Sequence, residues 1–217
     1  MKYHLNLEKY SIEKFKKNLK KRDMIPSRVV LKESIDQRFN IIASQGINNL
    51  KQLSNELKTK QKIESFSNDT GLSIEYLSIL KREANSYLPS PVQLAKIPGI
   101  NTSIINCLEK IGIKNTKQLY DKVNSEKGLQ QISNLTGISL DEFSELASLA
   151  DLTRLYGVGP VFARIIYDVG ITSVEIFAKC TAKEFINIYE ESTNKKADFG
   201  ENEINFSIEL AKELINT

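Results

Sequence analysis

The sequence predicts an all-α protein built from tandem helical repeats. No stretch between turn signals alternates strictly between apolar and polar residues, as a half-buried strand would. Large apolar residues instead recur at the spacing of one helix face, for example Leu50, Leu53 and Leu57. The chain also matches itself at a fixed offset, which indicates a repeat architecture.

Two pairs of segments define the repeat. "QGINNLKQL" at 45–53 returns as "IGIKNTKQL" at 111–119, and "SNDTGLSIEYL" at 67–77 returns as "SNLTGISLDEF" at 133–143. The offset is the same in both pairs, because position 45 corresponds to 111 and position 67 to 133. At a slightly shorter offset, "LAKIPGINTSIINCLEKIGI" (94–113) matches "LTRLYGVGPVFARIIYDVGI" (152–171), and a degenerate copy, "LKESIDQRFNIIASQGI", occupies 31–47.

Helix ends are marked along each repeat. Gly71 and Gly137 stand where a helix needs a left-handed terminal residue. Ser139 and Glu142 have the spacing of a capping box, and Thr181 opens another one before "FINIYEE". A last amphipathic helix is expected in "ENEINFSIELAKELI".

These signals divide the chain into four segments. Residues 1–26 form a basic N-terminal helix, 27–90 a first repeat unit with a degenerate hairpin, and 91–150 a second unit. Residues 151–217 hold the third hairpin and the C-terminal helices. Each hairpin is expected to be followed by two short helices.

Charge is distributed unevenly. Residues 1–38 carry 11 Lys or Arg against 5 Asp or Glu, whereas 184–217 carry 3 against 8. The N-terminal helix has an apolar stripe of Ile12, Phe15 and Leu19 among lysines, so it either docks on the first repeat or lies along an anionic surface. Without a signal peptide or a long apolar run, we expect a cytoplasmic protein with no membrane span.

The residue types argue against an enzyme. His4 is the only histidine, and the carboxylates form no recognised metal or catalytic pattern, so we expect no catalytic residue, cofactor or metal ion. Cys107 and Cys180 lack the spacing of a metal or redox pair and are expected to be reduced core residues.

The repeated template, two helices joined by a glycine turn and closed by a second glycine, resembles the helix-hairpin-helix motif. In that family the N–H groups of the turn contact a nucleic-acid phosphate, which fits the donors left unpaired at a helix N-terminus. Both glycines of the "GVG" turn are expected to be required, because positive φ and close backbone approach both exclude a β-carbon. The residues expected to contact nucleic acid are Lys96, Gly99, Ile100, Asn101, Thr102, Ser103, Arg154, Gly157, Val158, Gly159 and Arg164.

The same glycines also suit a purely structural corner. In that interpretation Val158 or Ile100 fills the space between two helices and Ala163 allows them to approach. Val161 and Phe162 stand where basic or hydroxyl side chains would reach phosphate, so they favour this alternative.

Over most of its length the chain resembles the bacterial family called domain of unknown function 4332. The resemblance is carried by "RDMIPSRVVLKESID", "REANSYLPSPVQLAKIPGI", "LTRLYGVGPVFARIIYDVGI" and "KADFGENEINFSIELAKEL". It implies the fold and no settled activity. We therefore expect sequence-independent binding of a DNA or RNA backbone, with a protein-interaction or self-associating scaffold as the alternative.

Overall fold

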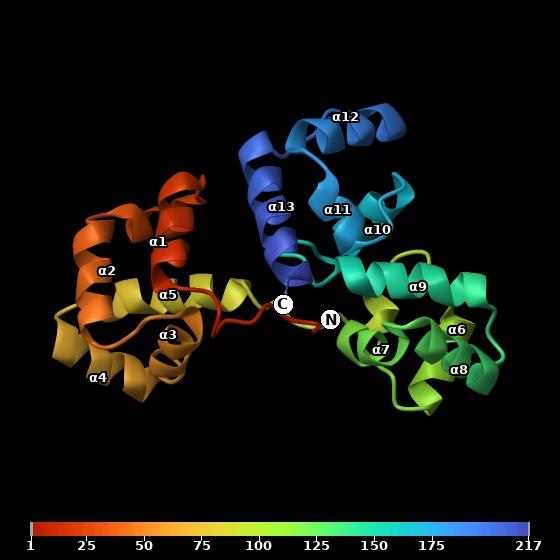
Figure 1. Ribbon diagram of the computed structural model, residues 1–217, viewed down its shortest axis with the longest axis horizontal. Helices are drawn as coiled ribbons and strands as arrows, with labels where there is room; N and C mark the ends of the chain where they lie inside the picture. Colours follow the sequence, from red (N-terminus) through yellow and green to blue (C-terminus); the bar gives the residue numbers. More distant parts are fainter. Residues whose placement is uncertain (1, 217) are drawn as a thin grey trace. The chain divides into compact units, whose positions relative to one another are not determined.

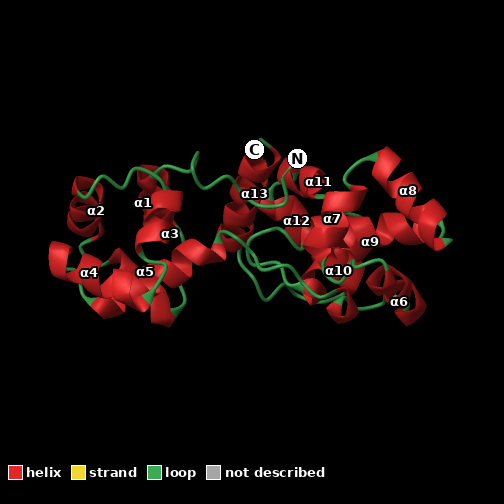
Figure 2. Ribbon diagram, turned by 90° about the horizontal axis from the view of Figure 1, so that it is seen from below, coloured by secondary structure: helices red, strands yellow, loops and turns green. Residues whose placement is uncertain are grey.

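The structure is a computed structural model that describes residues 2–216, and within that range it consists of helices and loops with two isolated β-bridges and no strand. The all-α prediction is confirmed (Figure 2). The chain divides into two compact units. Unit 2 is Asn6–Leu88, and unit 1 combines the start of the chain through Leu5 with everything from Pro89 onward.

Unit 2 contains six helical elements, coloured red to yellow in Figure 1. They are α1 (Ile12–Lys21), the 3-10 helix η1 (Pro26–Lys32), α2 (Ile35–Ser44), α3 (Leu50–Glu56), α4 (Lys60–Thr70) and α5 (Ile74–Ser86). The basic helix α1 is part of this unit, because its stripe of Ile12, Phe15 and Leu19 is buried and Phe15 meets Phe39 of α2 with ring centroids 5.9 Å apart.

A buried ion cluster joins three elements of unit 2. Glu83 of α5 is fully buried, and its two carboxylate oxygens accept from Arg22, just after α1, and from Arg28 of η1. A carboxylate without solvent needs such partners, since an isolated buried charge is strongly unfavourable. The segment between α1 and α2 is thereby attached to α5.

Unit 1 contains the remaining elements, coloured green to blue in Figure 1. They are the 3-10 helix η2 (Leu94–Lys96), α6 (Thr102–Lys110), α7 (Thr116–Val123), α8 (Glu126–Thr136), α9 (Leu140–Leu152), α10 (Pro160–Asp168), α11 (Val174–Lys179), α12 (Ala182–Thr193) and α13 (Glu201–Ile215). One apolar core runs through this unit and includes Phe143, Val174, Phe177 and Phe185, all fully buried.

The two units repeat one local design at the predicted offset. Helices α4 and α5 have the same lengths as α8 and α9, and the offset found in the sequence relates the first and last residues of each helix to those of its counterpart. Gly71 and Gly137 both end their helices at φ +71°, as predicted. The Ser67 hydroxyl donates to the Leu72 carbonyl at 2.6 Å, and Ser133 does the same to Ile138.

The capping predictions also hold. Ser139 with Glu142 forms the expected capping box at the start of α9, and Thr181 with Glu184 forms one at α12. A third box, which was not predicted from the sequence, joins Asn49 to Gln52 at α3. Side-chain caps of this kind satisfy first-turn N–H groups that a helix cannot pair internally.

Candidate functional site

Two exposed glycine turns of unit 1 contain the residues singled out from the sequence. We call residues 96–103 the second corner and residues 154–162 the third corner. Gly99 and Gly157 have φ values of +81° and +74°, so both need glycine for backbone reasons. Helix α6 begins just after Gly99, and helix α10 just after Gly157.

In the second corner, a side chain of the corner itself caps the N-terminus of α6. Its predicted contact residues are exposed apart from Ile100, which is half-buried against the core. The side-chain oxygen of Asn101 accepts from the N–H and the hydroxyl of Ser103, both at 2.9 Å. Lys96 lies nearby on the exposed side of η2. The amide of Asn101 thus takes the place that an external acceptor would occupy at Ser103.

The third corner lacks such a cap. Gly159 is the N-cap residue of α10 and provides no side chain, while Pro160 at the first helical position has no N–H. Within the described range, no internal acceptor pairs with the N–H groups of Gly159, Val161 or Phe162. Val158, one of the residues expected to contact nucleic acid, is buried between the glycines, as the purely structural interpretation predicted. The start of α10 therefore presents unpaired donors beside exposed glycines.

Gly159 corrects the expectation that backbone geometry requires both glycines of "GVG". Its φ is −83°, an ordinary value for any residue, and a β-carbon built there has no atom within 4 Å. In the second corner the equivalent position is occupied by Asn101. Neither strain nor packing accounts for a glycine at position 159.

Val161 and Phe162 have different environments. The Val161 side chain is 62% exposed at the start of α10. Phe162 is half-buried in an aromatic cluster, with its ring centroid 5.3 Å from that of Phe199 and 6.1 Å from that of Phe185. Phe162 is thus explained by packing, whereas Val161 remains an apolar side chain in solvent.

Arg164 connects the two corners instead of projecting from them. Its Nε donates to the Pro98 carbonyl at 3.1 Å, and its other nitrogens bind Asp168, at 3.2 Å, and Glu145. A β-carbon on Gly99 would lie 3.2 Å from the Arg164 guanidinium, so close approach is a second reason for glycine there. Two carboxylates already neutralise this cation.

Arg154 is buried, contrary to the expectation that it reaches a phosphate. Its Nε donates to Asp151 at 2.7 Å, and its Nη1 donates to the Lys2 carbonyl at 2.9 Å. The guanidinium also lies over the Tyr120 ring, 4.5 Å from the centroid. These contacts use the cation to hold the start of the chain against α7.

The N-terminal arm, residues 2–5, packs on unit 1 through Tyr3. Its hydroxyl lies 2.7 Å from the Thr116 hydroxyl, and its ring meets Tyr120 edge-on at 5.5 Å. Next to it, His4 Nδ1 is buried without a hydrogen-bond partner. Burial lowers the pKa of His4 below 6.5, and the charges of Lys117 and Arg154 lower it further.

This environment predicts a pH dependence of arm docking. His4 binds a proton more readily in the unfolded chain than in the folded protein. The stabilisation gained by burying neutral His4 is therefore fully present above pH 6.5, and it is lost as the pH falls through the lowered pKa of the folded protein. A proton NMR titration of the single histidine should give a pKa below 6.5. A value at or above 6.5 would contradict this environment, and His4→Gln should remove this pH dependence from the unfolding midpoint.

The net charge separates by unit. Side chains of unit 2 comprise 16 Lys or Arg and 10 Asp or Glu, a net of +6, whereas unit 1 has 14 against 17, a net of −3. Exposed lysines of α1 include Lys17 and Lys21. The basic surface and the glycine corners thus belong to different units.

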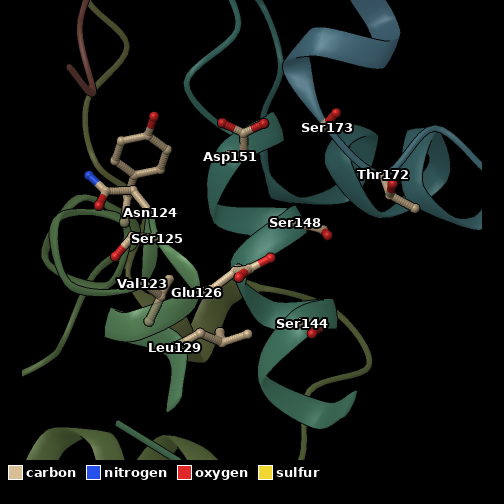
Figure 3. A pocket seen from close by; sticks show the side chains of 12 residues that line it. Val123, Asn124, Ser125, Glu126, Leu129, Ser144, Ser148, Asp151, Thr172 and Ser173 are labelled. Atoms are coloured by element: carbon tan, nitrogen blue, oxygen red, sulfur yellow. The ribbon is translucent and has the colours of Figure 1, made fainter. Parts of the chain in front are cut away.

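A groove of about 390 Å³ opens on unit 1 between α7, α8, α9 and the segment before α11 (Figure 3). Its side chains come from Tyr120, Val123, Asn124, Ser125, Glu126, Leu129, Ser144, Ala147, Ser148, Asp151, Thr172 and Ser173. The groove could not be predicted from the sequence, because four separate elements build it. The sequence contains one signal of the groove: at equivalent positions of the repeat, the first copy has Lys81 and the second has the much smaller Ala147.

The described residues contain no cluster of side chains able to hold a metal ion, and no described helix is long and apolar enough to cross a membrane. Residues 98–215 match the family model "Domain of unknown function (DUF4332)". The chain belongs to this family. The match covers residues 98–103 of the second corner, the whole third corner and most of unit 1. No curated protein and no solved structure matches the chain.

Proposed function

We propose that this DUF4332 protein is a non-catalytic, sequence-independent nucleic-acid-binding protein whose third corner contacts a backbone phosphate. Gly159 is the observation that carries the proposal. Glycine there leaves the N–H groups of Val161 and Phe162 uncapped, although neither φ nor packing excludes a capping side chain. A phosphate oxygen is a suitable acceptor for these donors because the positive end of the helix dipole favours an anion.

Both corners are proposed to be helix-hairpin-helix turns, in residues 94–113 and 152–171. The third corner has the open donors, whereas Asn101 partly satisfies the second. We therefore assign phosphate contact to Gly157, Gly159 and the first turn of α10. Lys96, the lysine predicted at the second corner, is exposed and adds a positive charge there. Arg154 and Arg164 have structural partners and are not part of this contact.

Electrostatic attraction in this proposal comes from unit 2. Its net charge is +6, and Lys17 and Lys21 are exposed on α1. Unit 1 is net negative, so its corner positions a phosphate and adds no long-range attraction. We expect a dissociation constant of about 10⁻⁴ to 10⁻⁶ M that rises steeply with salt.

Gly159→Asn tests the corner directly, because it copies Asn101 and should cap the N–H of Val161 internally. We expect folding stability to stay within a few tenths of a kcal/mol of wild type or to rise slightly. Affinity for a short duplex should fall about tenfold, since one charge-assisted hydrogen bond is lost. Fluorescence anisotropy with duplex and single-stranded oligonucleotides at two salt concentrations measures the affinity.

Two control variants separate the contributions. Asn101→Gly opens the second corner in the same way and should not weaken binding. Lys17→Ala with Lys21→Ala should weaken binding and reduce its salt dependence, whereas Gly159→Asn should leave the salt dependence nearly unchanged. Wild-type affinity in Gly159→Asn, or no binding by the wild type at low salt, would refute the proposal.

Val161 supports a second candidate function, a protein-interaction module. Its side chain is 62% exposed at the third corner, and nearby Arg164 is neutralised by carboxylates. A partner protein would cover this valine, whereas a phosphate would not. Val161→Lys discriminates between the two, because it should strengthen nucleic-acid binding at the corner and disrupt an apolar protein contact.

A further inference from the structure

The internal repeat shows what the groove of unit 1 lacks. Helices α4 and α5 of unit 2 correspond to α8 and α9 at the offset of the sequence repeat, and the turns between them share the same glycine conformation and serine bond. At this offset Lys81 of α5 corresponds to Ala147 of α9, and Lys58 corresponds to Asn124. Ala147 and Asn124 both line the groove.

In unit 2 a lysine side chain occupies the equivalent place. The Lys81 ammonium donates to the Lys58 carbonyl at 2.7 Å, just beyond the end of α3. A carbonyl at a helix C-terminus is a favourable acceptor for a cation, because the last carbonyls lack helical partners and the dipole is negative there. The aliphatic stem of Lys81 thereby crosses the surface from α5 to the end of α3.

In unit 1 the same acceptor remains and the lysine is missing. Asn124 is the C-cap residue of α7, and no side chain of residues 2–216 donates to its carbonyl. Ala147 lines the groove and has no side chain beyond its β-carbon, so it cannot reach the end of α7 as a lysine would. Val123 and Leu129 provide apolar walls on the α7 and α8 side.

The groove is also more acidic than its counterpart. Glu126 replaces Lys60, and Asp151 replaces Asn85. Asp151 is bound to Arg154 and to the N–H of Val174, so Glu126 is the carboxylate that remains for a ligand. None of the lining residues is basic. The lining thus suits an aliphatic chain that ends in a cation.

We propose that the groove of unit 1 binds a lysine side chain presented by a partner protein, in the place that Lys81 occupies within unit 2. The aliphatic stem lies along Val123, Leu129 and Ala147. The ammonium donates to the Asn124 carbonyl and pairs with Glu126. An ammonium suits this end because it is compact and donates in several directions, as the Lys81 ammonium does to the Lys58 carbonyl. The net charge of −3 on unit 1 favours a basic partner segment.

Nuclear magnetic resonance of the full chain tests the site with N-acetyl-lysine N-methylamide as the probe. We expect saturable shifts of the Asn124, Leu129 and Ser148 amides at millimolar probe concentration. N-acetyl-norleucine N-methylamide, which lacks the ammonium, should cause no saturable shift there. Ala147→Lys, which rebuilds the Lys81 arrangement inside the chain, should abolish binding while the remaining spectrum stays that of the folded protein.

The reciprocal double variant Lys81→Ala with Lys60→Glu gives an independent test, because it opens the equivalent place in unit 2 and supplies there the carboxylate that Glu126 provides in unit 1. It should create a second set of lysine-probe shifts at Lys58. The proposal is overturned if the wild-type groove does not respond to the lysine probe, if both probes shift it equally, or if Ala147→Lys binds like wild type. Absence of new shifts in the folded double variant would refute the equivalence on which the proposal rests.

Discussion

Replacing Glu83 by alanine should destabilise unit 2 by about 3–5 kcal/mol. The carboxylate is fully buried, and it is bound by Arg22, which is 8% exposed, and by Arg28. Its removal takes away the carboxylate that both cations share and opens a cavity beside α5. The loss exceeds that of ordinary surface pairs because Glu83 and Arg22 bind each other in the interior, where water cannot replace the lost contact.

Hydrogen exchange resolves this effect by unit. Amides of α1, η1 and α5 should lose protection in Glu83→Ala, while those of α9 and α13 keep theirs. Glu64→Ala is the matched control, since Glu64 pairs with Lys60 on the exposed surface of α4 at 3.7 Å, and it should change stability by under about 1 kcal/mol. Equal effects of the two variants would show that the buried cluster does not stabilise the unit.

Replacing Asp151 by alanine should destabilise unit 1 by a similar amount, about 3–5 kcal/mol. One carboxylate oxygen accepts from Arg154, whose side chain is 1% exposed, and the other accepts from the N–H of Val174 at 2.7 Å. The variant leaves a buried guanidinium without its carboxylate and removes the acceptor at the start of α11. The N-terminal arm should detach as well, because Arg154 also holds the Lys2 carbonyl.

Chemical denaturation and hydrogen exchange at Tyr3 measure this loss. The matched control is Asp121→Ala in the same unit, because Asp121 pairs with Lys117 on the exposed side of α7 and should contribute under about 1 kcal/mol. Asp151→Ala combined with Arg154→Met should recover part of the stability, since an apolar side chain needs no counter-charge. A double variant as unstable as Asp151→Ala alone would contradict the charge argument.

Local signals in the sequence predicted the helices and their ends. The capping boxes at Ser139 and Thr181 and the left-handed Gly71 and Gly137 lie where the sequence indicated. These features depend on residues within about four positions of each other, so residue type and spacing are sufficient to predict them. The constant offset between the sequence repeats likewise predicted that α4 and α5 recur as α8 and α9.

The role of each charged residue was beyond local reasoning. Arg154 and Arg164 stand next to a glycine corner in sequence, which made them candidates for phosphate contact. Arg154 is paired with Asp151 and Lys2, and Arg164 with Glu145, Asp168 and Pro98. Several of these partners are distant in sequence, so spacing could not reveal them.

The two glycines of the third corner show the same difference between what the sequence predicts and what only the structure reveals. Sequence alone established a tight corner before a helix, because two glycines and a proline leave few other backbone paths. Only the three-dimensional structure separated Gly157, which φ requires, from Gly159, which neither φ nor packing requires. Backbone conformation and helix capping follow from neighbouring residues, whereas burial, charge pairing and open space depend on atoms brought together from distant parts of the chain.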